Sequence, residues 1–216
     1  MSEAYAAHEF QYSSAEHQQG TAAAGMWLFL ATELLFFGGL FLTWIYARHW
    51  NRSGFDAAGD ETELWIGTLN TVLLITSSFV YAIGVAAARV GNNRRVLWCC
   101  LGAIGIGVTF LLLKFGLEWG DDFHKHLFPV GPDFHFTGAL EPGARLFYVF
   151  YFIGTGLHGV HMLVGIALVS WMAWLAYRGA FSPLYYTPVM IVGLYWSFVD
   201  MIWIILYPLI YLIGRP

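Results

Sequence analysis

Charged side chains are scarce in this chain of 216 residues: 11% are charged, while 58% are hydrophobic and 19% aromatic. A soluble domain carries about a quarter charged residues, because its surface must be solvated. Most of this chain's surface must therefore meet something other than water, and bilayer lipid is the simplest candidate. Lys and Arg together number ten and the net charge is −4, which leaves no basic face for nucleic acid.

Cysteine is also rare, and the two cysteines, Cys99 and Cys100, are adjacent. Neighbouring side chains on a helix point about 100° apart, so these thiols cannot bind one metal ion from one helix face. The sequence has no C-x-x-C or C-x-x-x-C pattern, which argues against a chain that carries copper or an iron–sulfur cluster. We interpret both cysteines as small apolar residues of a membrane helix.

Lys and Arg are missing from residues 1–20, which contain Glu3, Glu9 and Glu16. A secretory signal peptide begins with a positively charged region, so we expect none here. We predict a polar N-terminal segment over residues 1–21. The first hydrophobic stretch would then direct insertion and remain in the mature protein.

Long hydrophobic stretches make up most of the remaining sequence. A helix needs about 20 apolar residues to cross the hydrocarbon core of a bilayer. The sequence therefore predicts an all-α integral membrane bundle of about five transmembrane helices, in one domain over residues 22–216. The connection at 48–63 is acidic and contains glycine. The expected spans are roughly 22–47, 64–88, 96–117, 146–177 and 185–213.

The density of basic residues near the span ends predicts the orientation. Arg89, Arg94 and Arg95 crowd one very short connection, and such connections stay in the cytoplasm. We therefore expect a multi-pass protein with a cytoplasmic N-terminus and a periplasmic C-terminus.

Two acidic residues, Glu33 and Asp200, lie deep within predicted spans. A carboxylate at mid-depth costs about 2.5–3.5 kcal/mol, so it usually faces protein or water. Glu33 is consistent with a proton-relay carboxyl, a polar tie to a partner helix, or a neutral structural residue. Asp200 is expected to pack inward, where a hydroxyl, an imidazole or Glu33 would satisfy it, and a structural role is favoured.

Two histidines, His158 and His161, lie in one span, and a spacing of three places them on one helix face. Together they could bind a metal ion only with a further ligand. They cannot hold a haem iron from opposite sides, and no other predicted span contains a histidine. The favoured interpretation is hydrogen bonding at a tight, glycine-lined helix contact. The loop histidines His124, His126 and His135 are expected to be solvated.

Lys114 and Glu118 are one helical turn apart at the end of the third span, so we expect them to pair and extend toward the interface. No complete redox or hydrolytic constellation is visible. We therefore expect no catalytic, cofactor-binding or metal-binding residue in this chain. The residues alone are consistent with a membrane scaffold, a transporter fragment or an accessory subunit.

Three strings in order resemble subunit III of the haem-copper respiratory oxidases, the cytochrome c oxidase subunit 3 family in its bacterial five-helix form. They are Gly25-Met26-Trp27-Leu28-Phe29-Leu30 with Glu33 and Phe36-Phe37, Gly156-Leu157-His158-Gly159-Val160-His161, and Tyr195-Trp196-Ser197-Phe198-Val199-Asp200 with Trp203. Leu69-Asn70-Thr71 and Glu118 also fall where the family pattern places them. The likeness runs from Gly25 to the C-terminus. It departs from the family at Ser197, where the family has histidine, and the resemblance implies that the first span here corresponds to the third of the seven mitochondrial helices.

The resemblance implies an accessory, metal-free subunit of a proton-pumping aa3- or caa3-type cytochrome c oxidase in a bacterial inner membrane. Its partners would be subunits I and II, a small subunit IV and membrane lipids, with cytochrome c as the donor to the complex. Haem a, haem a3 and copper would belong to the partner subunits. This chain would bind phospholipid, stabilise the catalytic subunit and support proton uptake. Glu33 would be the buried family glutamate, near lipid and a proposed oxygen route.

Other functions stay open. The chain could be subunit III of a quinol oxidase or an accessory subunit of a nitric oxide reductase, although a glutamate at position 33 favours the cytochrome c type. A stand-alone transporter would need a cavity lined by its own polar residues and would work without haem partners. A haem b anchor is disfavoured by the histidine count.

Overall fold

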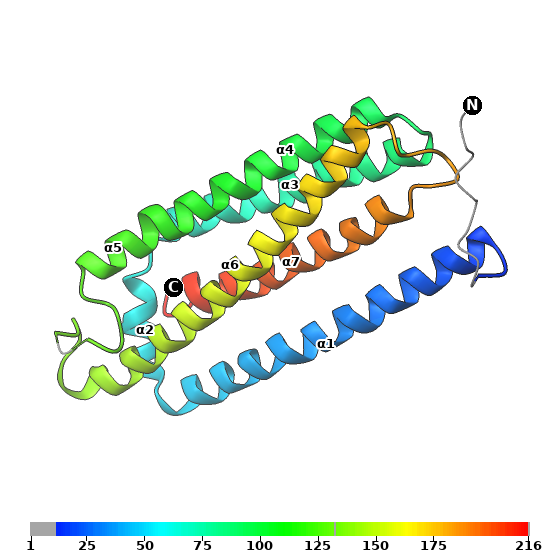
Figure 1. Ribbon diagram of the computed structural model, residues 1–216. Helices are drawn as coiled ribbons and strands as arrows, with labels where there is room; N and C mark the ends of the chain where they lie inside the picture. Colours follow the sequence, from blue (N-terminus) through cyan, green and yellow to red (C-terminus); the bar gives the residue numbers. More distant parts are fainter. Residues whose placement is uncertain (1–11, 132, 216) are drawn as a thin grey trace.

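The computed structural model describes residues 12–131 and 133–215, which form a bundle of long helices (Figure 1). Five helical stretches are long and apolar enough to cross a membrane, which confirms the predicted all-α membrane bundle. The described residues contain no strand beyond an isolated bridge between Ser182 and Tyr185. The long stretches are α1 (Ala15–Trp50), α3 (Leu64–Arg89), α4 (Asn93–Leu111) continued by η1 (Leu112–Glu118) and α5 (Trp119–His124), α6 (Glu141–Tyr177) and α7 (Thr187–Tyr211).

Local sequence signals set where several helices begin. The Ser14 side chain accepts a hydrogen bond from the His17 backbone N–H at 3.0 Å, so α1 begins at Ala15 rather than near residue 22. Proline lies in the first turn of α6 and of α7, where its missing N–H removes no helical hydrogen bond. Residues 1–11 of the expected N-terminal segment lie outside the described residues.

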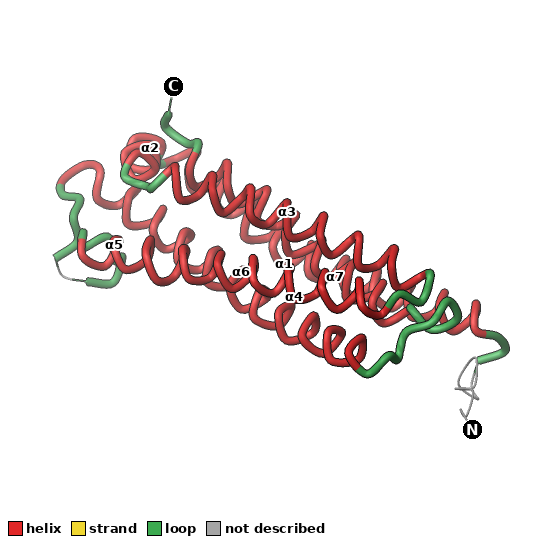
Figure 2. Tube along the Cα trace, turned by 90° about the horizontal axis from the view of Figure 1, so that it is seen from above, coloured by secondary structure: helices red, strands yellow, loops and turns green. Residues whose placement is uncertain are grey.

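A short helix, α2 (Arg52–Asp60), occupies the connection that the sequence indicated only as acidic and glycine-containing. It lies across the end of the bundle and is seen nearly end-on in Figure 2. Phe55 and Ala58 are fully buried, so α2 is an amphipathic part of the core. Gly54 allows α2 to approach α6 closely, since a Cβ at this position would lie only 2.6 Å from the Cα of Gly143.

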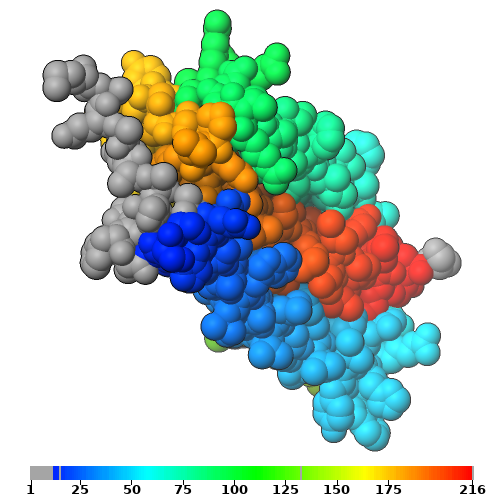
Figure 3. Space-filling view, turned by 90° about the vertical axis from the view of Figure 1, so that its right-hand side faces the viewer, coloured from blue at the N-terminus to red at the C-terminus, as the bar shows by residue number. Residues whose placement is uncertain are grey.

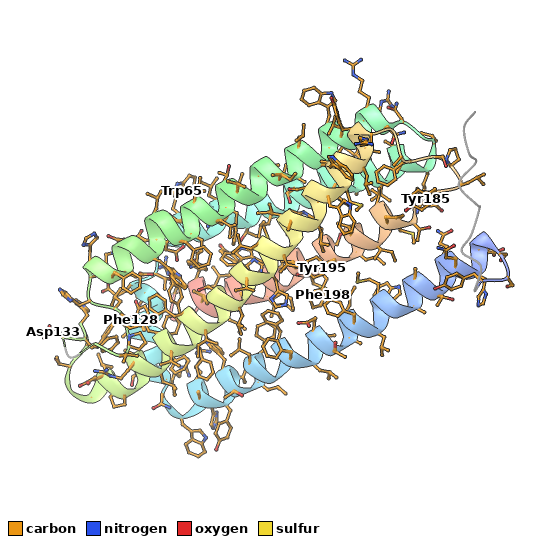
Figure 4. All side chains as sticks on the ribbon, in the orientation of Figure 1. Trp65, Phe128, Asp133, Tyr185, Tyr195 and Phe198 are labelled. Carbon is orange, nitrogen blue, oxygen red and sulfur yellow. The ribbon has the colours of Figure 1, made fainter. Side chains whose placement is uncertain are left out.

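Helix α1 lies at the edge of the bundle and α7 at its centre (Figure 1). In the most apolar stretch of α1, 17% of the residues are buried, compared with 56% in the most apolar stretch of α7. Tyr195 and Phe198 lie on the side of α7 that faces α1 (Figure 4). Much of the α1 surface is therefore left to lipid or to another protein.

The continuous helix from Asn93 to His124 contains one wide π turn, η1. Such turns are rare and often occur at functional sites, because the extra residue changes the direction of the side chains around it. Lys114 and Glu118, both on η1, point into the bundle and are buried.

Candidate functional site: polar side chains inside the bundle

Lys114 and Glu118 form a buried ion pair. The Lys114 Nζ lies 2.8 Å from the Glu118 Oε1, and the side chains are 0% and 1% exposed. The predicted pairing is confirmed. The expected extension toward the interface is wrong, because both side chains point inward from the π turn and tyrosines of two other helices surround them.

The two tyrosines are Tyr151 of α6 and Tyr211 of α7. The Lys114 Nζ donates to the Tyr211 hydroxyl at 2.7 Å and to the Tyr151 hydroxyl at 3.0 Å, and it lies 4.3 Å from the centre of the Tyr151 ring. With Glu118, these contacts use all three ammonium donors. The ring face adds a cation–π attraction.

The carboxylates complete the network, which we call the lysine cluster: Lys114, Glu118, Asp122, Tyr151 and Tyr211. The Tyr211 hydroxyl donates to Glu118 Oε1 at 2.6 Å. The Tyr151 hydroxyl lies 2.6 Å from Asp122 Oδ2 and 3.0 Å from Glu118 Oε1, so its single proton favours the nearer Asp122. The network joins η1 and α5 to α6 and α7.

Sequence reasoning identified Glu118 but missed the cluster around it. The residues 114, 118 and 122 are spaced four apart, which places their side chains on one helix face. That spacing could have predicted Asp122 as a member. Nothing in the sequence links this face to Tyr151 or Tyr211, because they belong to distant helices.

Glu33 of α1 contacts His161 of α6, with 3.1 Å between Glu33 Oε2 and His161 Nε2. The other ring nitrogen, Nδ1, lies 2.8 Å from the Leu157 carbonyl oxygen, which can only accept a hydrogen bond. Nδ1 therefore carries a proton. The contact with Glu33 then needs a second proton, either on Nε2 or on the carboxyl group, and the pair can hold a proton between α1 and α6.

His158 lies one turn before His161 but contacts different helices. It is fully buried, and its ring packs 5.1 Å from the Trp203 ring of α7 and 5.4 Å from the Phe110 ring of α4. Neither of its ring nitrogens makes a hydrogen bond to a described residue. The expected hydrogen bond is therefore present for His161 and absent for His158. The expected glycine contact is present, since a Cβ on Gly159 would lie 2.3 Å from the Phe115 ring.

Asp200 of α7 is 4% exposed and accepts a hydrogen bond from the Ser78 hydroxyl of α3. Of the partners expected for this carboxyl, the structure therefore provides the hydroxyl. Ser197 lines an apolar groove of about 340 Å³ between α1 and α7. Trp27 and Phe198 lie in the same groove.

The loop histidines His124, His126 and His135 lie at the surface and are exposed. Cys99 and Cys100 are free thiols; Cys99 is partly buried and Cys100 is buried. In the described part of the chain, no three His, Cys, Asp or Glu side chains are placed to hold a metal ion.

Lys125, which follows the third long helix, pairs with two carboxylates. Its hydrogen bonds to Asp121, at 2.6 Å, and to Glu63, at 3.0 Å, raise the pKa of Lys125.

Comparison with known proteins shows one family. Residues 6–215 match the family described as cytochrome c oxidase subunit III. The chain is 34% identical over 200 residues to cytochrome c oxidase subunit 3 of Thermostichus vulcanus, covering 88% of this chain and 87% of the relative. It is 29% identical to cytochrome bo(3) ubiquinol oxidase subunit 3 of Pseudomonas aeruginosa, covering 96% and 93%. Heme-copper oxidase subunit I+III of Aeropyrum pernix is 25% identical over 88% of this chain but only 22% of the relative.

Substituting Lys114 tests whether the lysine cluster holds the bundle together. Lys114→Met leaves Glu118 buried without its cation, so we expect a loss of about 3–5 kcal/mol in the free energy of unfolding. The double variant Lys114→Met/Glu118→Gln should lose less than the sum of the two single changes. Unfolding in mixed detergent micelles, followed by circular dichroism, measures both.

Lys125→Met is the matched control, because this lysine pairs with two carboxylates but is 35% exposed. A surface pair contributes about 0–1 kcal/mol. Equal losses for Lys114→Met and Lys125→Met would contradict a stabilising role of the buried cluster.

Proposed function

Because the chain belongs to the cytochrome c oxidase subunit III family and is therefore subunit III of a haem-copper oxidase, we propose that its oxidase is an aa3- or caa3-type enzyme that takes electrons from cytochrome c. The choice of a cytochrome c oxidase rests on sequence identity, which is 34% to a cytochrome c oxidase subunit and 29% to a ubiquinol oxidase subunit. The complex would reduce oxygen to water and pump protons. This chain would be a non-catalytic part of it.

The partner that the comparisons support is subunit I. The relative from Aeropyrum pernix is named as subunit I+III, so the two subunits are one chain there. We propose that subunit I packs against this bundle here too, together with subunit II and a small subunit IV. Haem a, haem a3 and copper would lie in those partners. The exposed apolar surface of α1 is available for such packing or for bound phospholipid.

The buried polar groups support a structural and proton-related role. Glu33 joins α1 to α6 through His161, and Asp200 joins α7 to α3 through Ser78. Each contact links helices far apart in the sequence, and in a bilayer no water can replace the lost partner. We propose that these ties hold the subunit in the shape that supports proton uptake by the complex.

The distribution of charge supports a cytoplasmic N-terminus, which we propose together with a location in a bacterial inner membrane. Four arginines lie at the end of the bundle near the start of α1, and no described carboxylate pairs with them. The four are Arg89, Arg94, Arg95 and Arg178. Three of the four share one very short connection, and basic residues crowded into a short connection at the span ends favour the cytoplasmic side. The opposite end has five basic residues, but they are spread over longer connections and the C-terminal segment: Arg48, Arg52, Lys125, Arg145 and Arg215.

Reporter fusions test this orientation. Alkaline phosphatase folds to an active form in the periplasm, so fusion after Arg215 should give an active enzyme and fusion after Arg95 an inactive one. Activity in the reverse pattern would overturn the proposed orientation.

Purification of the tagged chain from its native membrane in mild detergent tests the type of oxidase. We expect a reduced-minus-oxidised spectrum of haem a, together with a large many-helix subunit and a copper-binding subunit. Haem b or haem o would instead indicate a quinol oxidase or a nitric oxide reductase. A colourless chain without partners would contradict the accessory role and favour a stand-alone transporter.

Glu33→Ala and Asp200→Ala variants of the complex test the proposed ties. We expect reduced assembly, or activity that declines faster over many turnovers, because a buried partner group loses its hydrogen bond. Thr76→Ala is a control, since the Thr76 hydroxyl is exposed and, among the described residues, bonds only to the Val72 carbonyl of its own helix. Complexes of both variants that assemble fully and keep full activity would contradict the proposal.

A further inference from the structure

Three arginines gather around one open pocket at the end of the bundle where α1, α2 and the C-terminal segment meet. The pocket has a volume of about 390 Å³ and is lined by Arg48, Arg52 and Arg215, with Asp56 as its single acidic residue. In Figure 3 the end of α1 and the start of α2, in light blue and cyan, lie beside the end of α7 in red. Asp60, Glu61 and Glu63 follow at this end but do not line the pocket.

The guanidinium groups keep free hydrogen-bond donors. The Nη2 of Arg48 lies 2.9 Å from Asp56 Oδ1, and the Nε of Arg52 lies 3.5 Å from Asp56 Oδ2. Arg215 uses its Nη2 for the backbone carbonyls of Gly59, Asp60 and Thr62. Each guanidinium has five N–H donors, so most have no partner among the described residues. One carboxylate faces three cations, and the pocket therefore attracts an anion.

The polypeptide holds two of these arginines in place. Arg48 is fixed by its pair with Asp56. Arg215 caps the C-terminal end of α2, and Gly214 before it has a φ of 75°. A Cβ on Gly214 would lie 2.7 Å from the Asp56 carbonyl oxygen, so only glycine allows the chain to come this close to α2. Arg52, with a side chain 80% exposed, remains free to close over a ligand.

The opposite wall of the pocket is apolar. Trp44, Pro208, Leu209 and Leu212 line it, and they belong to the ends of the membrane helices α1 and α7. The wall continues into a narrow crevice between α1, α6 and α7 that also contains Trp44 and Leu209. A basic rim above an apolar wall, at the depth where membrane helices end, matches a phosphate group joined to acyl chains.

We propose that this pocket binds the phosphate group of an anionic phospholipid, with the three guanidiniums on the phosphate and the acyl chains against the wall formed by α1 and α7. This site deepens the proposed function, which includes phospholipid binding without saying where. A free phosphate would use the basic rim alone and leave the apolar wall without a role. An acidic segment of a partner subunit would use the charges but would have to displace lipid from the wall.

The test uses the intact oxidase complex in detergent and two photoactivatable probes, phosphatidylglycerol and phosphatidylcholine. Peptide mass spectrometry locates the labelled residues. We expect the phosphatidylglycerol probe to label residues 44–52 and 208–215 more strongly than the zwitterionic probe. Arg52→Gln should reduce this labelling about tenfold, because charge-assisted hydrogen bonds to phosphate are lost. Arg52→Gln/Arg215→Gln should reduce it further.

Arg94→Gln/Arg95→Gln is the matched control, since these arginines lie at the other end of the bundle, and labelling at the pocket should not change. The Arg52 variant matters most, because its side chain is exposed and its loss leaves the fold intact. Equal labelling by both probes, or equal labelling of all variants, would overturn the proposal. So would displacement of the phosphatidylglycerol probe by millimolar inorganic phosphate, which would identify a free anion as the ligand.

The haem spectrum of the same preparation separates this inference from the proposed function. Haem b or haem o would refute the cytochrome c oxidase assignment while the labelling pattern still stood. A haem a spectrum, together with labelling that is the same in the arginine variants as in the unsubstituted complex, would refute the lipid site alone.

Discussion

A lysine ammonium held away from water sets the arrangement of the helices around it. In a medium of low dielectric constant, an isolated charge is very costly, so Lys114 can be buried only where every one of its donors finds an acceptor. Those acceptors come from Glu118 on the same π turn, Tyr151 on α6 and Tyr211 on α7. The requirement therefore fixes the depth and rotation of α6 and α7 relative to the third long helix, and the rest of the bundle packs around that contact.

The other polar contacts of the bundle follow the same rule on a smaller scale. The Trp196 indole donates to the Ser77 hydroxyl at 2.8 Å, and the Trp203 indole donates to the Thr71 hydroxyl at 3.1 Å. Both join α7 to α3. Inside a membrane the apolar surfaces of helices gain little by contact, because lipid is equally apolar, so close packing and hydrogen bonds select the partners. The central position of α7 reflects this, since it carries polar groups toward several neighbours.

The sequence predicted the fold class, the number of membrane helices and the Lys114–Glu118 pair, because these depend on hydropathy and local spacing. It did not predict the direction in which Lys114 points, since that depends on tyrosines of helices distant in the sequence. Helix α2 was missed because nine residues that include three charged side chains give no hydropathy signal, although Phe55 and Ala58 are its buried face. The Ser78 partner of Asp200 was expected only as a chemical type, because a hydroxyl can come from any neighbouring helix.

The contact between Glu33 and His161 has a consequence for the order of events during synthesis. The two residues are 128 positions apart, and α1 leaves the ribosome long before α6. At roughly 5–20 residues per second, Glu33 enters the membrane about 6–26 seconds before its partner exists. During that interval the carboxyl group has no imidazole to share a proton with. The cost of a carboxyl group within the first membrane helix is therefore borne without this contact until the second half of the chain arrives.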